Sequence, residues 1–218
     1  VLAHHHDRSD HQEQAEHDGH ADHAEHDEHD GHGDHEGGGG HAHHAGHAAG
    51  TPDPHLWTDP VAMREVARAL ARELRAGLGV DLSDRLADLE LRLGALDAEV
   101  RRQVAALPAG RRKLVTGHES MGYFAQRYGL TLVGAVIPGL SSSAEASAAQ
   151  LSRLKRLIQR EQVEVVFTEI GTPPRVVKAL ARECGVKAVP ITTHSLPPDG
   201  SYLTFVRDLA RTVTESLR

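Results

Sequence analysis

The sequence contains one cysteine, few aromatic residues and no long apolar run. The single cysteine, Cys184, excludes an internal disulfide and a thiolate zinc cluster of the finger type, so a metal site in this chain must use histidine and carboxylate side chains. No apolar stretch reaches the roughly 18 residues that span a membrane. The N-terminus also lacks a basic region followed by an apolar one, so the sequence predicts neither a membrane anchor nor an export signal within this chain.

Positive charge is scarce at the beginning of the chain and only slightly in excess afterwards. Residues 1–50 hold twelve acidic side chains against one arginine, whereas residues 51–218 hold nineteen acidic side chains against twenty-three lysines and arginines. The overall net charge of −7 therefore comes from the first 50 residues. The remainder has no dense stripe of lysine and arginine, and aromatics make up only 3% of the chain, which gives no reason to expect a nucleic-acid partner.

Histidine is the residue type that the chain has in excess. Fifteen of its eighteen histidines lie within the first 47 residues, interleaved with aspartate and glutamate, and the other three are His55, His118 and His194. Residues 1–52 are too polar to bury a core, so we interpret them as a disordered loop that gathers metal ions weakly and raises their local concentration. An artificial purification tag is the alternative, but a tag would be one compact run of histidines.

The remaining residues divide into a helical linker region, residues 53–110, and a C-terminal α/β lobe, residues 111–218. In the linker region, Asp59-Pro60 is typical of a helix start, and leucines and valines at helical spacing predict a second helix over Ser83–Leu107. Four β-rich runs then alternate with helical patterns, which predicts a four-stranded parallel sheet with helices on both faces. The expected strands are Lys113–Thr116, Leu130–Ile137, Val163–Thr168 and Val186–Ile191, and the expected helices are Ser120–Tyr128, Ala144–Arg160, Pro174–Cys184 and Tyr202–Leu217.

The three isolated histidines fall where a parallel sheet would bring them together. His118 follows the first predicted strand and His194 follows the last, and ligands collect at the carboxyl ends of the strands in such sheets. His55 lies in the turn before the first helix. A single histidine in a loop is usually a surface residue, but here all three histidines of the folded part occupy such positions. They predict a zinc or manganese site, in which imidazole nitrogens converge at about 2.0–2.1 Å from zinc.

Two glutamates near these histidines have alternative interpretations. Glu169, at the end of the third predicted strand, is either a ligand or the acceptor of a hydrogen bond from the second nitrogen of a ligating histidine, and we favour the second role. Glu119 follows His118 as in the zinc-peptidase motif, but Gly122 stands where that motif has its second histidine. Glu119 is therefore expected to be an acidic residue of a helix first turn. Ser141-Ser142-Ser143 lacks the remainder of a phosphate loop and is interpreted as a plain loop with a helix cap.

Three segments of the chain resemble the metal-binding substrate-binding proteins of ABC zinc and manganese importers. They are Asp53-Pro54-His55-Leu56-Trp57-Thr58-Asp59-Pro60; Gly117-His118-Glu119-Ser120-Met121-Gly122-Tyr123-Phe124-Ala125, followed by Tyr128-Gly129-Leu130; and Val166-Phe167-Thr168-Glu169. Their order and spacing match the family, and the resemblance extends from about Asp53 to the C-terminus. Zinc-type members often carry a His/Asp-rich loop directly before the Asp-Pro-His segment, as this chain does.

The resemblance implies a metal site between two lobes joined by a long helix, with four ligand positions. It places ligands at His55 and His118, and the last ligand, often an aspartate, falls on His194. An imidazole in place of that carboxylate favours Zn²⁺ over Mn²⁺. The family's first ligand, a histidine of an N-terminal lobe, has no counterpart in this sequence. We therefore expect the chain to lack most of that lobe and to carry three of the four ligands, with an open tetrahedral position for water or another residue.

The resulting hypothesis is a solute-binding component of an ABC zinc importer, which captures Zn²⁺ and delivers it to a membrane permease without catalysis. The resemblance implies a periplasmic or extracytoplasmic location, and we expect a monomer. One alternative is a stand-alone zinc buffer or metallochaperone that binds through the His-rich tail. Another is a zinc hydrolase, since three histidines and an open position also describe a catalytic zinc, with Glu119 or Glu169 as general base.

Overall fold

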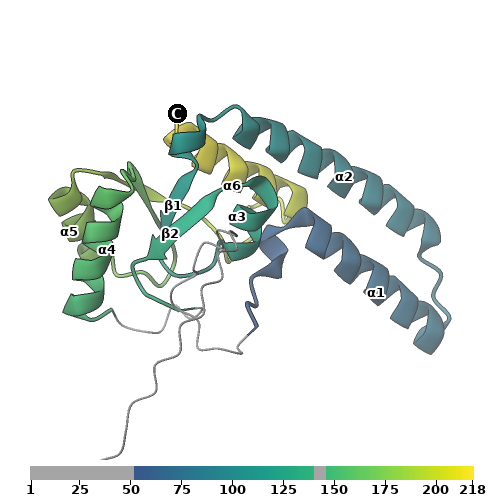
Figure 1. Ribbon diagram of the computed structural model, residues 1–218. Helices are drawn as coiled ribbons and strands as arrows, with labels where there is room; N and C mark the ends of the chain where they lie inside the picture. Colours follow the sequence, from purple (N-terminus) through teal and green to yellow (C-terminus); the bar gives the residue numbers. More distant parts are fainter. Residues whose placement is uncertain (1–51, 140–145) are drawn as a thin grey trace, which may run out of the picture. The chain divides into compact units, whose positions relative to one another are not determined.

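The computed structural model describes residues 52–139 and 146–218 of the chain. In this part, strands and helices alternate after two long helices, as predicted (Figure 1). The helices are α1 (Pro60–Leu78), α2 (Ser83–Ala105), α3 (Gly122–Tyr128), α4 (Ala148–Arg160), α5 (Pro174–Cys184) and α6 (Tyr202–Ser216). The strands are β1 (Lys113–Thr116), β2 (Thr131–Ala135), β3 (Val165–Thr168) and β4 (Lys187–Pro190). Short 3-10 turns at Leu56–Thr58 and Ala109–Arg111 precede α1 and β1.

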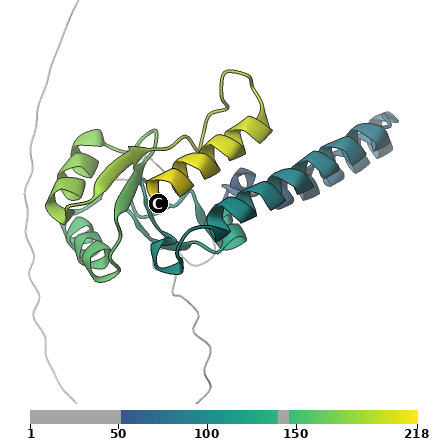
Figure 2. The same cartoon turned by 90° about the horizontal axis from the view of Figure 1, so that it is seen from above.

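Helices α1 and α2 form a hairpin that extends away from the sheet (Figure 2). Asp59 caps α1 by accepting a hydrogen bond from the backbone N–H of Val61, which satisfies one of the donors that a helix start leaves free. Gly79 ends α1 with a φ of 67°, a left-handed conformation that glycine adopts without steric cost. Arg68 of α1 donates to Glu90 of α2, so the hairpin is also joined by an ion pair on its surface.

The four strands form one parallel sheet in the order β2-β1-β3-β4. The chain passes from β1 to β2 on one side and then crosses back, so that β3 and β4 lie on the other side of β1. The connections that leave β1 and β3 at their carboxyl ends therefore diverge, and such a switch point is where parallel sheets bind ligands. The predicted α/β class with a four-stranded parallel sheet is confirmed.

Both faces of the sheet are buried under helices. Leu114 and Phe167 point to one face, where they pack in a cluster with residues of α2, α3 and α6. Val115 and Val166 point to the other face and pack with residues of α4 and α5. These two helices lie side by side in Figure 1. All four side chains are fully buried, which is why the strands are apolar at consecutive positions instead of alternating with polar residues. The packed sheet thus supports the loops at its edge.

Two elements near the loop after β1 are shorter than predicted. Helix α3 begins at Gly122 instead of Ser120, and the Ser120 side chain donates a hydrogen bond to Glu169 from the loop before the helix. Strand β2 ends at Ala135 instead of Ile137, although the N–H of Ile137 still donates to a backbone carbonyl beside β1. Both differences lengthen the loops at the carboxyl edge of the sheet, where His118 lies.

Only the C-terminal half of α2 packs against the lobe. Leu96 and Val100 are fully buried beside α6, whereas Leu91 is 76% exposed. On α1, Leu70 is 57% exposed, so helical spacing of apolar residues predicted the helices correctly without indicating which turns are covered. Within the described residues, no helix combines the length and hydropathy needed to cross a bilayer. The predicted His-rich tail and the loop at Ser141–Ser143 lie outside the described residues.

Candidate metal centre

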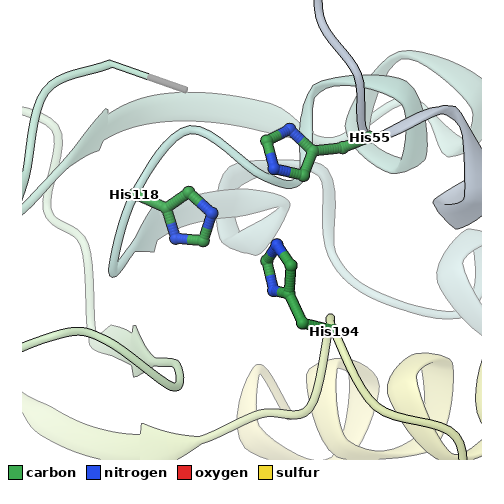
Figure 3. Close-up of side chains that lie close together, drawn as sticks. All are labelled: His55, His118 and His194. Atoms are coloured by element: carbon green, nitrogen blue, oxygen red, sulfur yellow. The ribbon is translucent and has the colours of Figure 1, made fainter. Parts of the chain in front are cut away.

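The three histidines that were singled out in the sequence lie together at the carboxyl edge of the sheet. The centroids of the His55, His118 and His194 rings are 5.0 to 5.3 Å apart. One nitrogen of each ring points into a shared space (Figure 3), and these nitrogen atoms all lie within 4.8 Å of one another. Nitrogen ligands of a tetrahedral zinc are about 3.4 Å apart, so a shift of roughly 1 Å would bring the rings close to coordination distance.

His55 is held by the aspartate two residues before it. The Asp53 Oδ1 atom accepts a hydrogen bond from the backbone N–H of His55 at 2.9 Å and lies 2.7 Å from the ring atom Nδ1. Because a carboxylate is an acceptor, Nδ1 carries the ring hydrogen, and the lone pair is on Nε2. A Cβ atom at Gly122 would lie 2.8 Å from Asp53 Oδ2, so this glycine leaves room for the carboxylate.

His118 is supplied by the loop that follows β1. Its backbone carbonyl accepts a hydrogen bond of 2.6 Å from the Thr116 hydroxyl, which fixes the turn at the strand end. The side chain is 1% exposed. Its Nδ1 atom lies 3.4 Å from Glu169 Oε2 and makes no hydrogen bond within the described part of the chain. The ring is therefore positioned by packing and by a nearby negative charge.

Glu169 lies behind the histidines, at the end of β3. Its side chain is completely buried, and its Oε2 atom accepts hydrogen bonds from the hydroxyls of Ser120 at 2.6 Å and Thr193 at 2.5 Å. Its Oε1 atom accepts a third from the backbone N–H of Gly117 at 3.2 Å. These donors come from the loops that follow β1 and β4, so one carboxylate joins both loops. In residues 52–139 and 146–218, the group that could share one ion is the three histidines, without Glu169.

His194 is the most exposed member of the group and lies in the loop after β4. Its Nδ1 atom lies 2.7 Å from the hydroxyl oxygen of Thr193, the residue before it. Thr193 itself is 2% exposed. Two histidines of the group are thus buried and the third is exposed.

An aromatic contact joins the loop of His55 to the loop of His194. The indole N–H of Trp57 donates to the backbone carbonyl of Thr193 at 2.7 Å, and the Tyr202 hydroxyl donates to the carbonyl of Trp57 at 2.9 Å. The Trp57 ring lies edge-on to both His55 and His194, with centroids 5.2 and 5.6 Å away. Burial raises the pKa of Tyr202, which keeps the phenol protonated and able to donate.

The surroundings favour neutral imidazoles. Burial lowers the pKa of His118; the carboxylate of Glu169 opposes this effect, and the other two histidines of the group lower the pKa further. Burial of its ring also lowers the pKa of His194, although the residue as a whole is exposed; Glu169 again opposes the shift and His55 adds to it. A histidine must be neutral to bind a metal ion, so these shifts keep lone pairs available at neutral pH.

The sequence interpretation was wrong about Glu119 and missed several supporting residues. Glu119 lies in the loop three residues before α3 and is buried, so it is not a first-turn residue of that helix. Asp53 had a visible signal, since it stands in the Asp-Pro-His segment beside His55. Thr193 and Ser120 also stand close to predicted ligands, but nothing local in the sequence indicates that both contact Glu169.

Residues 2–216 match the sequence pattern of the family described as zinc-uptake complex component A, periplasmic (ZnuA). The chain belongs to the ZnuA family. Its curated relatives include the zinc-binding protein TroA of Treponema pallidum, 35% identical over 132 residues, which are 59% of this chain and 42% of TroA. Another is the high-affinity zinc uptake system protein ZnuA of Bacillus subtilis, 32% identical over 142 residues, which are 65% of this chain and 44% of that protein. The sequence matches thus cover less than half the length of these two relatives.

Solved structures of similar proteins have the same fold. The periplasmic zinc-binding protein TroA of Treponema pallidum superposes with a TM-score of 0.64 and 27% identity, over 76% of this chain and 64% of TroA. Fe(III)-bound YtgA of Chlamydia trachomatis superposes with a TM-score of 0.67 and 25% identity, over 78% of this chain and 65% of YtgA. The fold and family expected from the three sequence segments are therefore confirmed.

Proposed function

We propose that this chain captures Zn²⁺ as part of the solute-binding component of an ABC zinc importer, outside the cytoplasm, and delivers it to a membrane permease. The observation that carries the proposal is the convergence of His55, His118 and His194, three segments far apart in the sequence, with ligand atoms within 4.8 Å of one another. The zinc-binding and zinc-uptake relatives support the choice of cargo. No catalytic step is proposed.

The proposed ligands are the Nε2 atoms of the three histidines. Each Nδ1 atom faces an oxygen atom instead: Asp53 beside His55, Glu169 near His118, and Thr193 beside His194. A hydrogen bond or a nearby carboxylate at Nδ1 orients the ring and makes Nε2 a stronger donor to a metal ion. Three histidines leave one position of a tetrahedral zinc for a further ligand, such as water.

The donor set favours zinc over harder ions. Three imidazoles suit zinc, copper or nickel, whereas manganese prefers carboxylate, carbonyl and water oxygens. Glu169, whose buried carboxylate lies 3.4 Å from Nδ1 of His118, already accepts three hydrogen bonds and is proposed to support the ligands rather than to bind the ion. YtgA is a relative with Fe(III) bound, so a test of cargo should include iron and manganese beside zinc.

Trp57 provides a test that reports on this site. It is the only tryptophan of the chain, it stands outside the histidine-rich residues 1–47, and its ring lies against His55 and His194. Zinc binding to the three histidines is expected to change the Trp57 fluorescence. The change is expected to be complete when one zinc ion is bound by these three residues. Co²⁺, a paramagnetic quencher of the same preferred geometry, should quench the emission, and zinc should reverse the quenching by displacement.

The same titration distinguishes transport capture from buffering by the tail. Replacing His4, His5 and His6 by alanine should leave the amplitude of the Trp57 signal unchanged. If the full chain binds zinc without any change in Trp57 fluorescence, the binding is assigned to residues 1–47, and the buffer alternative is supported. Stronger binding of Mn²⁺ or Fe³⁺ than of Zn²⁺ at the Trp57-reported site would contradict the proposed cargo.

Asp53→Asn is expected to lower zinc affinity about tenfold, the lower end of the range for residues that orient a ligand. The amide keeps an oxygen acceptor for the His55 N–H groups but loses the negative charge that makes the ring a better donor. Affinity would be measured by competition with a chelator, followed by Trp57 fluorescence. The matched control is Asp81→Asn, since Asp81 also accepts hydrogen bonds two residues along the chain but is exposed in the α1–α2 turn. Equal effects of the two substitutions would show that Asp53 has no special role.

A further inference from the structure

One residue, Thr193, links all three histidine-bearing segments. Its backbone carbonyl accepts the indole N–H of Trp57, two residues after His55. Its hydroxyl lies 2.5 Å from the Glu169 carboxylate, which also accepts hydrogen bonds from the loop of His118. The same hydroxyl oxygen lies 2.7 Å from Nδ1 of His194. A single hydroxyl therefore touches both the buried carboxylate and the exposed histidine of the site.

The direction of the hydrogen bonds around Thr193 follows from the chemistry of Glu169. An ionised carboxylate only accepts, and a hydroxyl has one hydrogen to donate. The short Thr193 to Glu169 contact therefore uses the hydroxyl hydrogen, so the oxygen is left to accept. The donor to that oxygen is the Nδ1–H of His194, 2.7 Å away. This order leaves the lone pair of His194 on Nε2, which points toward the other two rings (Figure 3).

We propose that Thr193 is a positioning residue of the metal site. Its hydroxyl donates its hydrogen to Glu169 and accepts the Nδ1–H of His194, which sets the tautomer in which Nε2 of His194 faces the ion. These two hydrogen bonds are called the relay below. The inference rests on the proposed function, because it assigns a role toward the same three ligands. The tautomer of His194 depends on this relay more than that of His55 does. Nδ1 of His194, the exposed member, faces a hydroxyl, which can donate or accept, whereas Nδ1 of His55 faces a carboxylate, which only accepts.

Two substitutions of Thr193 separate the hydroxyl from the shape of the side chain. Thr193→Val keeps the volume and the backbone carbonyl that receives Trp57, but it removes the relay. Thr193→Ser keeps the hydroxyl and removes a methyl group. The valine variant is expected to lose about 10- to 100-fold in zinc affinity, the range found when a partner of a ligating histidine is removed. The serine variant is expected to bind zinc close to as tightly as the unchanged protein.

A threonine elsewhere provides the control for stability. Thr214 of α6 is also buried, at 1% exposure, and its hydroxyl also makes a hydrogen bond, to the carbonyl of Ala210 at 2.8 Å. Thr214→Val should reduce the urea midpoint of unfolding without changing zinc affinity. Affinities of the full chain and its variants would be measured with Trp57 fluorescence and a competing chelator.

A second measurement does not depend on zinc. The ring nitrogen chemical shifts of His194, recorded by ¹⁵N NMR on the metal-free protein at a pH where the ring is neutral, report the tautomer directly. The Nδ1–H tautomer is expected for the unchanged protein and for Thr193→Ser, and a mixture with the Nε2–H tautomer is expected for Thr193→Val. This signature would not follow from a general loss of stability.

The outcomes decide between the inference and the proposed function. Loss of affinity in the valine variant alone, together with the tautomer change, supports the relay. Equal affinity in all variants, equal losses in the serine and valine variants, or an Nε2–H tautomer in the unchanged protein would overturn it. If the valine variant does not fold, the serine variant and the tautomer of the unchanged protein still decide. Absence of any Trp57-reported zinc binding in the unchanged protein would instead refute the proposed function.

Discussion

Replacing His118 by alanine is expected to lower the affinity of the structured site for zinc by more than about 100-fold, because removing even an indirect partner of a ligand costs about 10- to 100-fold. His118 is the most buried of the three histidines, at 1% exposure, and lies within ring contact of both others. Within the described residues, the group that could hold an ion consists of the three histidines, so the substitution leaves two ligands there.

The measurement is chelator competition on the full chain, followed by Trp57 fluorescence. The Trp57 ring lies against His55 and His194, so the substitution at position 118 leaves the surroundings of the reporter in place. The matched control removes three histidines from the first 47 residues, His4, His5 and His6, and is expected to leave this affinity nearly unchanged. Similar losses in both variants would contradict the assignment of the site, because they would show that no structured position binds more tightly than the tail.

The sequence predicted where the histidines would meet because sheet topology decides it. The alternation of short apolar runs and helical patterns after Gly110 requires a parallel sheet, and all carboxyl ends of a parallel sheet lie at one edge. His118 and His194 follow β1 and β4 closely, so their positions could be predicted once the strands were assigned. His55 was harder, because its position depends on a loop before the sheet. Only its place in the Asp-Pro-His segment indicated that it joins the other two.

The hydrogen-bonded support of the site could not be predicted, because it depends on strand register. β3 and β4 pair with Thr168 opposite Pro190, which places Glu169 at the level of the residues just after β4 and within reach of Thr193. A shift of one residue would turn the Glu169 side chain to the other face of the sheet. Local sequence patterns give the approximate bounds of each strand, but they do not fix register to one residue. The contact across 24 residues of chain therefore had no local signal.

Glu169→Gln is expected to lower zinc affinity about 10- to 100-fold, even though the residue is not a proposed ligand. The carboxylate accepts from Ser120, Thr193 and Gly117, and it lies 3.4 Å from the His118 ring. An amide of the same shape has only one oxygen, and its NH₂ group is a donor. Where that NH₂ group faces the Thr193 hydroxyl, two donors meet, and the hydroxyl must accept instead.

The reversal at Thr193 is the reason to expect a large effect from a change of one atom. A hydroxyl that accepts from the amide introduced by Glu169→Gln directs its own hydrogen toward Nδ1 of His194, which moves the ring hydrogen to Nε2 and blocks that lone pair from the ion. The substitution should therefore shift the His194 tautomer in the metal-free protein, in the same direction as Thr193→Val. The matched control is Glu164→Gln, an exposed glutamate at the other end of β3 whose carboxylate pairs with Arg111. A Glu169→Gln variant with unchanged affinity and an unchanged His194 tautomer would mean that the carboxylate only fills space behind the loops.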